Sequence, residues 1–491
     1  MNIKSELKQL SHDYNYLPVS ASVQLNQFDP FQIINHDEPD ANHSMMFEYQ
    51  DSRYTAVVIK PLQVITARNG NVQTTDQSGQ TTEQTTSPIT FLNQLIHKYQ
   101  VPKLSLPPFS TGLIGYFGYD FAKYDQNNRL TDTPDDLDLA DLELMIPDIT
   151  LTYDRQNHQL TASQLIASEH LNTEYEATIQ RLEDRLNEVI TILSQQKPKL
   201  PGLKINGKFK NQFNLAQFDE RVAQTKHHIE LGDIFQLILS NPYQASAQGS
   251  LINVGKTLFE DVKSPYHFYF ANNDFQSVGA SPETLISKSN AHLFSYPLAG
   301  TRRRGHDQVE DEKFAAELTH SPKELAEHNM LVDLGRNDLG RVSEFGSVHV
   351  TKLRELLRFS NVMHLGSKIK SVANKEFTPV DIVSAVLPAG TLSGAPKESA
   401  MKIIAKLEQR KRGIYGGGIG YIDFNGDLDL CIGIRLGYKK GDHLVIHSGA
   451  GIVADSDANQ EFHEFGNKSR LMLDAIKAEQ AQEENQYDLT N

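Results

Sequence analysis

Short apolar–polar alternations closed by very tight turns are the feature that most restricts how this chain can fold. Asn425-Gly426 lies between the alternating segments 421–424 and 428–430, and Asn-Gly is the strongest short-range signal for a β-hairpin. A second tight turn follows at residues 439–442. Strands joined by so few residues pair antiparallel, because parallel strands need a long crossover connection. The pattern therefore predicts antiparallel sheets rather than a doubly wound parallel sheet.

Helical periodicity and chain breakers divide the sequence into two portions. An apolar stripe of Leu182, Leu186 and Ile190 predicts a helix over 170–195, and prolines with a glycine break it at 195–202. We place the boundary there, between an N-terminal portion, 1–200, and a second domain, 210–475. The polar, low-complexity residues 74–86 are predicted to form an exposed loop of the first portion.

Composition excludes several classes of function. The 491 residues carry a net charge of −15, which argues against a nucleic-acid partner, since phosphate binding needs clustered Lys and Arg. No apolar run is long enough to span a membrane, and the polar N-terminus lacks the apolar segment of a signal peptide. We therefore expect a cytoplasmic protein without membrane contact.

The single cysteine, Cys431, rules out disulfides within the chain and cysteine-based zinc sites. It lies in a predicted strand, which indicates a buried structural thiol rather than a nucleophile. The glycines at 416–418 precede a strand and lack a following Gly-Lys-Ser/Thr, so a phosphate loop is not expected.

Carboxylates recur at helical spacing in two segments. Glu324 can complete a capping box that begins at Ser321, but no capping rule accounts for Glu327 one turn later. A second set shares one helix face at i, i+3 and i+7: Glu461, Glu464 and Lys468. Such faces are either solvated charged stripes or the protein part of a Mg²⁺ site, whose shell water and substrate oxygens complete.

Arg435 is singled out by the two-residue period of segment 428–437. The even positions are aliphatic and predict a core face, whereas Arg435 lies on the opposite face between Gly433 and Gly437. Small neighbours leave room for a planar carboxylate to meet the guanidinium; the alternative is a surface arginine. Further along, Gly449-Ala450-Gly451 could offer backbone N–H groups to a second carboxylate.

Six motifs occur in one order along the second domain. They are Pro297-Leu-Ala-Gly-Thr-Arg302, Glu324-Leu-Ala-Glu-His328, Val362-Met-His364, Pro388-Ala-Gly-Thr-Leu-Ser-Gly-Ala-Pro-Lys397, Gly449-Ala-Gly-Ile-Val-Ala-Asp455 and Glu461-Phe-His-Glu-Phe-Gly-Asn-Lys468. Together they resemble the chorismate-utilising enzymes, and most closely the component I chains of anthranilate synthases. The resemblance implies an α+β fold of antiparallel β-sheets packed as a sandwich with surrounding helices. It also implies Mg²⁺, attack of ammonia at C2 of chorismate, loss of the C4 hydroxyl, and elimination of pyruvate to give anthranilate, the first step of tryptophan biosynthesis.

The same resemblance implies roles for individual residues. Glu283 matches the general acid of the family, which needs a raised pKa, and His364 matches its active-site histidine. The catalytic set is Glu283, His364, Gln236 and Thr301. The substrate contacts are Gly300, Thr301, Tyr415, Arg435, Gly449, Ala450, Gly451 and Lys468. The metal ligands are Glu327 and Glu464, with Glu324 and Glu461 as outer carboxylates.

Two positions bear on which nucleophile attacks the ring. Similar enzymes that add water at C2 have a lysine base where this chain has Gln236, and those that make 4-amino-4-deoxychorismate commonly have a nucleophilic lysine where it has Ala299. Neither side chain here can serve as base or nucleophile, so ammonia at C2 is favoured. The alternatives are an aminodeoxychorismate synthase component I and a non-catalytic chorismate-binding subunit.

The resemblance also implies partners and a regulatory site. A separate glutamine amidotransferase subunit is expected to supply ammonia, because Cys431 does not lie at an exposed strand-to-helix turn, and a heterotetramer is the expected assembly. The tryptophan-site motifs of component I chains fall at Tyr49 and at Pro265, Tyr266 and His267, with altered sequence. Whether tryptophan still inhibits is left open by these changes.

Overall fold

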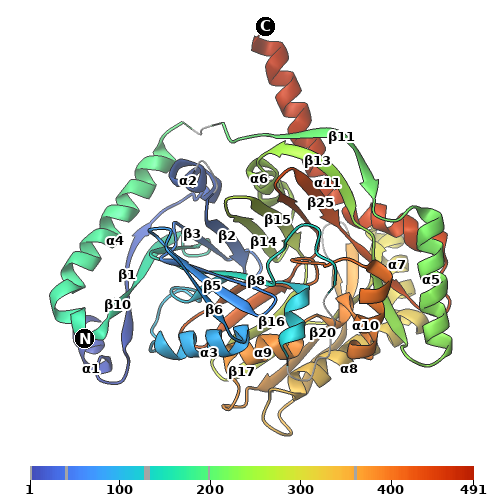
Figure 1. Ribbon diagram of the computed structural model, residues 1–491, viewed down its shortest axis with the longest axis horizontal. Coiled ribbons are helices and arrows are strands. Elements are labelled where there is room, and N and C mark those ends of the chain that lie inside the picture. Colours follow the sequence, from blue (N-terminus) through green and yellow to red (C-terminus); the bar gives the residue numbers. More distant parts are fainter. Residues whose placement is uncertain (1–2, 39–41, 126–132, 197–198, 359–361, 491) are drawn as a thin grey trace.

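The computed structural model describes residues 3–38, 42–125, 133–196, 199–358 and 362–490, and two large sheets hold most of the strands (Figure 1). In order across the first sheet, the strands are β1 (Tyr16–Gln24), β10 (Gln159–Ala167), β9 (Thr150–Asp154), β3 (Tyr54–Ile59), β2 (Ser44–Tyr49), β14 (Tyr266–Ala271), β15 (Phe275–Ser281), β24 (Leu436–Lys440), β25 (His443–His447), β13 (Tyr243–Gly249) and β11 (Leu203–Asn211). The pairings along this sheet are antiparallel, as the tight turns predicted.

The second sheet is antiparallel as well. Its strands are β18 (Leu298–Arg303), β20 (Val362–Val372), β17 (His292–Ser295), β16 (Thr284–Ser289), β23 (Leu428–Ile432), β22 (Gly418–Ile422), β7 (Leu113–Phe117), β8 (Leu142–Ile146), β4 (Gln63–Arg68), β5 (Asn71–Asp76) and β6 (Thr81–Thr85), with β19 (His349–Arg358) paired to β20. The predicted hairpin at Asn425-Gly426 is the turn between β22 and β23.

The two sheets pack face to face over an aromatic core, which confirms the predicted sandwich. Phe47 and Tyr49 of the first sheet contact Tyr421 of the second, with ring centroids 6.4 and 5.1 Å apart. Tyr116 and Phe270 meet edge to face across the same layer, at 5.3 Å. Aromatic pairs of this kind add to the free energy gained from burial and fix how the two faces align.

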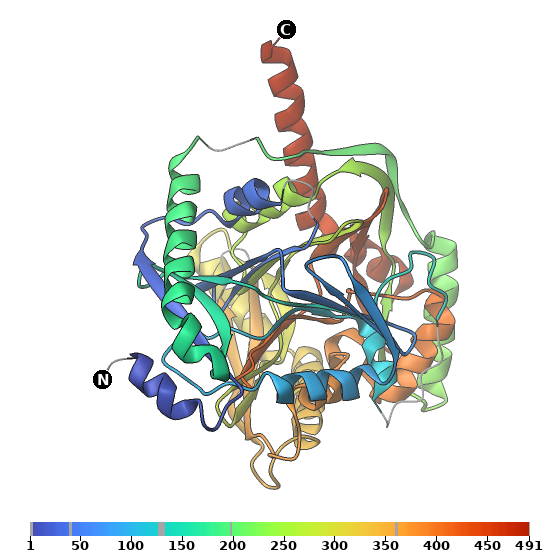
Figure 2. The same cartoon turned by 60° about the vertical axis from the view of Figure 1, so that its left-hand side comes forward.

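Helices cover the outer faces of both sheets, so the molecule has helical layers outside a β-sandwich (Figure 2). The first sheet is covered by α2 (Pro30–Asp37), α4 (Leu171–Ser194), α6 (Ile252–Asp261) and α11 (Ala458–Thr490). The second is covered by α3 (Pro88–Lys98), α8 (Pro322–Gly340) and α9 (Pro379–Val386). The remaining helical segments are α1 (Ile3–Leu10), α7 (Gln308–His320), η1 (Tyr119–Tyr124), η2 (Ser168–His170) and η3 (Gly390–Leu392).

A small third sheet lies beside the sandwich and positions part of the site. Its strands are β21 (Gly394–Ala395), β12 (Gln236–Ser240) and β26 (Gly449–Ile452). Apolar residues of these strands pack against α5 (Leu215–Glu230), α10 (Lys397–Glu408) and α11.

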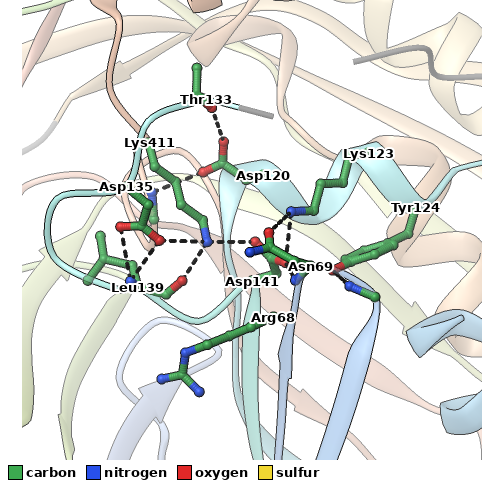
Figure 3. Close-up of polar contacts among 12 residues, drawn as sticks. Arg68, Asn69, Asp120, Lys123, Tyr124, Thr133, Asp135, Leu139, Asp141 and Lys411 are labelled. Atoms are coloured by element: carbon green, nitrogen blue, oxygen red, sulfur yellow. Dashed lines mark hydrogen bonds and ion pairs between the residues drawn. The ribbon is translucent and has the colours of Figure 1, made fainter. Parts of the chain in front are cut away.

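The N-terminal portion and the second domain share both large sheets. β2 pairs with β14 in the first sheet, and β7 pairs with β22 in the second. Buried charges also join the portions: Lys411 Nζ lies 2.8 Å from Asp141 and 3.1 Å from Asp135 (Figure 3). The linker at 195–202 lies partly outside the described residues, and the separate roles of the two portions stay predictions.

Two local predictions in the N-terminal portion need correction. Residues 74–86 do not form a loop, because β5 and β6 pair there as an exposed hairpin with hydroxyl contacts such as Thr74–Thr82, 2.6 Å apart. On α4, Leu182, Leu186 and Val189 are fully buried, whereas Ile190 is only half-buried. Among the described residues, no helix is long and apolar enough to cross a membrane.

Candidate active site

A cavity of about 220 Å³ opens where β18 and β20 of the second sheet meet the small sheet and α11. Seven residues predicted from the sequence line it: Glu283, Thr301, His364, Tyr415, Arg435, Gly449 and Lys468. They come from segments spread over nearly two hundred residues, and the fold gathers them around one concave space. Such convergence of polar and titratable groups marks the best candidate for a binding site.

The β18–β20 pair holds the histidine. Thr301 stands opposite His364 in the strand register. His364 Nδ1 lies 2.9 Å from the carbonyl oxygen of Gly300 and 3.2 Å from Thr301 Oγ1. A carbonyl only accepts, so Nδ1 carries the proton, and burial lowers the pKa of the imidazole. The ring is thus neutral and oriented at neutral pH.

Gly300 is required by space and by backbone conformation. Its φ is +64°, which favours glycine, and a Cβ there would lie 2.6 Å from Leu318 Cδ1 and 2.9 Å from Glu324 Oε2. A side chain would therefore push α7 and α8 away from β18. Gly300 itself shapes the strand and holds His364, and it is not among the residues that line the cavity.

Glu283 lies in the turn between β15 and β16 and presents its carboxyl group to the cavity. The Ile432 N–H donates to its backbone carbonyl at 2.9 Å, and Thr391 Oγ1 donates to Glu283 Oε1 at 3.2 Å. Burial raises the pKa of this carboxyl to about 7, against the hydrogen bond from Thr391 and the charge of Arg435. A carboxylic acid with that pKa can donate a proton near neutral pH, which is the role that the resemblance implies for Glu283.

Arg435 reaches the cavity by a different route from the one predicted. The continuous strand expected over 428–437 is wrong: β23 ends at Ile432, and Arg435 sits in a bend before β24 with a φ of +51°. Its Nη1 donates to the carbonyl oxygen of Lys468 at 2.9 Å. The bend, not a strand face, aims the guanidinium at the cavity, where it suits a carboxylate.

Lys468 and Tyr415 close the side formed by β26. Lys468 Nζ donates to the carbonyl oxygen of Gly449 at 2.7 Å and lies 2.5 Å from Glu464 Oε1. A Cβ on Gly449 would lie 2.7 Å from Tyr415 Oη, so the glycine leaves room for the phenol. Ala450 and Gly451 continue β26 outside the cavity lining, and Ala450 is fully buried.

The four predicted carboxylates of α8 and α11 lie outside the cavity lining, and Glu464 among them pairs with Lys468 of the wall. Burial, together with the charges of Glu324 and Glu464, raises the pKa of Glu327. Burial and Glu464 likewise raise the pKa of Glu461. This mutual repulsion fits the residues to a divalent cation, which would relieve it. No group of three or more metal-binding side chains occurs among the described residues, so other oxygen ligands would have to complete the shell.

The outer carboxylates have further partners of their own. Ser321 caps α8 by accepting from the Glu324 N–H at 3.4 Å, but the Glu324 carboxylate pairs with Arg302 at 3.0 Å. The reciprocal half of the predicted capping box is therefore replaced by an ion pair to β18. Glu461 accepts from Ser456 Oγ at 2.9 Å.

Gln236 and Ala299, the two positions that bear on the nucleophile, are placed differently. Ala299 lines the cavity, and Gln236 does not. The Gln236 Nε2 lies 3.0 Å from where a Cβ on Gly451 would stand, and Ile238, two residues further along β12, lines the cavity. Gln236 therefore lies next to the cavity wall rather than in it.

Several residues of the wall were not predicted from the sequence, among them Ile238, Thr391 and His447. His447 stacks on Tyr415 with ring centroids 4.0 Å apart, and its Nε2 lies 3.0 Å from Ser240 Oγ. Burial holds the pKa of this histidine well below its usual value. No motif marks His447, because it occupies one position of an ordinary alternating strand. Thr391 lies in a motif that was identified but was assigned to scaffold.

The predicted tryptophan-site residues lie around a second, larger cavity of about 640 Å³. Pro265 and Tyr266 line it, and Tyr266 Oη donates to Asp429 at 2.9 Å. Tyr49 is fully buried in the sandwich core. His267 is also buried, with Nδ1 2.6 Å from a Glu48 carboxylate oxygen. The structure brings these residues to one region, distinct from the first cavity.

The family model of chorismate binding enzymes matches residues 42–474, so the chain belongs to that family. The match includes most of the N-terminal portion, where the resemblance in sequence motifs is weak. Anthranilate synthase component 1 of Acetivibrio thermocellus is 34% identical over 96% of this chain and 97% of its own length. Aminodeoxychorismate synthase component 1 of Bacillus subtilis is 38% identical over 76% of this chain and 78% of its own. The crystal structure of anthranilate synthase component I from Streptococcus pneumoniae superposes with a TM-score of 0.73, at 35% identity, over 87% of this chain and 93% of that one.

Proposed function

We propose that this chain is the chorismate-converting component of an anthranilate synthase. It would combine chorismate with ammonia to give anthranilate and pyruvate, a lyase reaction that begins tryptophan biosynthesis. One observation carries the proposal: a proton-donating Glu283, a neutral His364 and the cations Arg435 and Lys468 meet at one cavity, and Glu464 pairs with Lys468 of its wall. Full-length similarity to anthranilate synthase component 1 chains supports it.

The charge and protonation of each residue would suit it to a different part of the substrate. Chorismate carries two carboxylates, and Arg435 lines the cavity and is suited to one of them by its planar fork. Glu283 would protonate the departing C4 hydroxyl, because its buried carboxyl still holds a proton near neutral pH. His364, fixed by Gly300 and Thr301, would orient a substrate oxygen or exchange a proton.

Glu327 and Glu464 would hold Mg²⁺, with Glu324 and Glu461 outside them. When bound, the ion would neutralise the substrate's ring carboxylate. Lys468 lies 2.5 Å from Glu464, so this side chain links the carboxylate pair to the β26 wall. The helices α8 and α11 thereby couple metal binding to the shape of the cavity.

Amination at C2 rather than C4 is favoured by Ala299. This side chain lines the cavity and offers no amine, so the lysine-dependent route of some similar enzymes is closed. The aminodeoxychorismate synthase relative, 38% identical over three quarters of the chain, keeps the 4-amino product as the second candidate. A non-catalytic chorismate-binding subunit is the third.

A separate glutamine amidotransferase would supply the ammonia, and the two kinds of subunit would form a heterotetramer. Cys431 is fully buried in β23, and burial raises the pKa of its thiol, so it is no nucleophile. Glutamine alone is therefore expected to give no product with the isolated chain, whereas ammonium salts should. Turnover with glutamine in a rigorously pure preparation would contradict the need for a partner.

The test is direct. Purified chain with chorismate, Mg²⁺ and excess ammonium at alkaline pH should form a fluorescent product with the spectrum of anthranilate. Binding of chorismate without turnover would instead support the non-catalytic reading, and a non-fluorescent amino product would support the 4-amino alternative.

A further inference from the structure

A buried ion pair lies behind the wall of the active-site cavity. Arg412 Nε donates to Glu408 Oε2 at 2.8 Å, and Arg412 Nη2 donates to the other carboxylate oxygen at 2.5 Å. The two side chains are only 2% and 4% exposed. α10 ends at Glu408 because Gln409 adopts a φ of +52°, and the chain then turns so that Arg412 meets the last residue of the helix. Arg412 is not among the residues that line the cavity, so any effect it has on a substrate passes through its neighbours.

Arg412 holds two segments of the cavity wall by their backbone. Its Nη1 donates to the carbonyl oxygen of Leu392 in η3 at 2.6 Å, and its Nη2 donates to the carbonyl oxygen of Ile238 in β12 at 2.8 Å. Leu392 and Ile238 both line the cavity. The two-residue strand β21 pairs only with Gln236 and Leu237 of β12. The guanidinium therefore adds a connection between η3 and β12 just beyond the paired residues.

The ion pair also reaches the two stacked rings of the wall. Glu408 Oε1 accepts from the Ser240 N–H at 2.7 Å, and Ser240 Oγ lies 3.0 Å from Nε2 of His447. The guanidinium carbon of Arg412 lies 5.8 Å from the centroid of the Tyr415 ring, within the range of a cation–π interaction. His447 and Tyr415 stack on each other, and both line the cavity. Lining residues on β12, η3, β25 and the segment before β22 are thus tied to one ion pair.

Stability alone does not account for this ion pair. Moving two charges out of water is costly, and replacing a buried ion pair by apolar side chains of similar volume is often neutral or stabilising. Apolar side chains could not donate to the carbonyl groups of Ile238 and Leu392, whereas a planar guanidinium carries five N–H donors in a fixed fork. We infer that Arg412 is a positioning residue of the proposed reaction: held by Glu408, it fixes the wall against which chorismate binds.

This inference rests on the proposed function and adds to it a residue that does not touch the substrate. Tyr415 is a predicted substrate contact, and Thr391, next to Leu392, donates to the carboxyl group of Glu283. A wall that shifts should therefore weaken chorismate binding and raise KM, besides lowering kcat. Loss of folded protein alone lowers the apparent kcat and leaves KM unchanged. KM and the affinity for chorismate therefore distinguish positioning from a purely structural role.

Two variants remove the connections in different ways. Arg412→Lys keeps a positive charge beside Glu408, but a compact ammonium group cannot span the acceptors that the fork reaches. The double variant Arg412→Met with Glu408→Gln removes both charges, so no buried ion is left unpaired, and the glutamine can still accept from the Ser240 N–H. Arg221→Lys is the matched control. Arg221 Nε donates to the Leu407 carbonyl at 2.9 Å, at the same end of α10, and Arg221 is not among the residues that line the cavity.

Each purified chain is assayed with Mg²⁺ and saturating ammonium for kcat and for KM of chorismate. Calorimetry without ammonium gives the Kd of chorismate, and circular dichroism checks the fold. We expect Arg412→Lys and the double variant to raise KM and Kd about tenfold or more, and Arg221→Lys to leave both unchanged. Unchanged KM and Kd in either variant that keeps its fold would overturn the inference, and so would an equal rise in Arg221→Lys. An unaltered chain that binds chorismate but forms no anthranilate would instead refute the proposed function, and the Kd values would still test Arg412.

Discussion

Glu283 shows how burial can prepare a single side chain for chemistry. Among the residues that the structure describes, Thr391 alone donates to its carboxyl group, and the charge of Arg435 is too weak to offset the loss of water. The uncharged acid is therefore favoured at a pH where an exposed glutamate is fully ionised. In the proposed reaction the same proton is the one that the C4 hydroxyl needs as it leaves.

We predict that Glu283→Gln lowers turnover by roughly 10²–10⁴-fold, the usual contribution of a general acid. The pKa of about 7 means that the donating form is lost as pH rises through neutrality. At constant free ammonia, kcat of the unaltered chain should therefore fall above that pH. Exposed Glu376→Gln serves as the matched control. A flat kcat profile through neutrality would contradict this role for Glu283.

Gln236 bears on which nucleophile is accepted. The amide cannot remove a proton from water, whereas a lysine at this position could. Gln236→Lys is thus expected to yield traces of isochorismate or salicylate beside a reduced amount of anthranilate, separable by chromatography. Because Gln236 lies next to the cavity wall rather than in it, the effect should be partial. Product ratios identical to those of the unaltered chain would remove position 236 from the selection of the nucleophile.

Site residues that lie in a motif were predicted correctly from the sequence, whereas residues that reach the cavity only through packing were not. Glu283, His364 and Lys468 lie in recognisable motifs, and all three line the cavity. His447 lies there too, but it is one position of an alternating strand, and its stacking on Tyr415 depends on how β25 meets the bend before β22. Such a contact joins distant parts of the chain and leaves no local signal.

At the element scale, α8 and α11 are the two supports of the proposed metal site. Each helix carries a pair of carboxylates one turn apart. The negative charge of Glu464 on α11 helps to raise the pKa of Glu327 on α8. Neither helix has a metal site by itself, since no three ligands lie together among the described residues. Mg²⁺ binding should therefore depend on both helices at once.

Glu464→Ala is predicted to abolish Mg²⁺-dependent turnover and leave the fold intact, since a change at the surface of a helix costs little stability. Asp474→Ala, an exposed acidic position on the same helix, should keep full activity. The measurements are ammonium-dependent rates over a series of Mg²⁺ concentrations and circular dichroism spectra. Full rates in EDTA, for either variant or the unaltered chain, would refute the metal site.

The elements themselves were predictable wherever a local rule applied. The Asn425-Gly426 turn specified the β22–β23 hairpin, and chain breakers limited α4. The alternating pattern through Arg435 predicted a continuous strand, and this prediction was wrong. Arg435 itself has a φ of +51° and interrupts the strand, although no glycine or proline at that position signals the break. The hairpin of β5 and β6 was hidden by its polar composition, since β6 is exposed along its whole length and its threonine side chains pair with those of β5.

At the scale of the whole molecule, the shared sheets make the sandwich core one structure. Asp429 of β23 is part of this interior: it is fully buried, and Tyr266 of the other sheet donates to it at 2.9 Å. Burial raises the pKa of this carboxyl to about 7 from an ordinary value of 3.8. The folded state therefore keeps a proton that the unfolded chain releases.

This group contributes its full stabilisation below the ordinary pKa of aspartate, and the contribution is lost as pH rises through about 7. The free energy of unfolding should thus be smaller one pH unit above that value than one unit below it. Asp429→Asn has no proton to lose and should reduce this difference. Urea denaturation at the two pH values measures both, and an equal drop in the variant would contradict the raised pKa.

The central claim is that the cavity directs ammonia to C2 of chorismate and completes the reaction to an aromatic amine. The measurement that tests it most directly is turnover of chorismate with ¹⁵N-ammonium and Mg²⁺, followed by NMR and mass analysis of the product. The account predicts anthranilate, with ¹⁵N on the ring carbon next to the carboxylate, and one equivalent of pyruvate. A product with ¹⁵N opposite the carboxylate and no pyruvate released would contradict it.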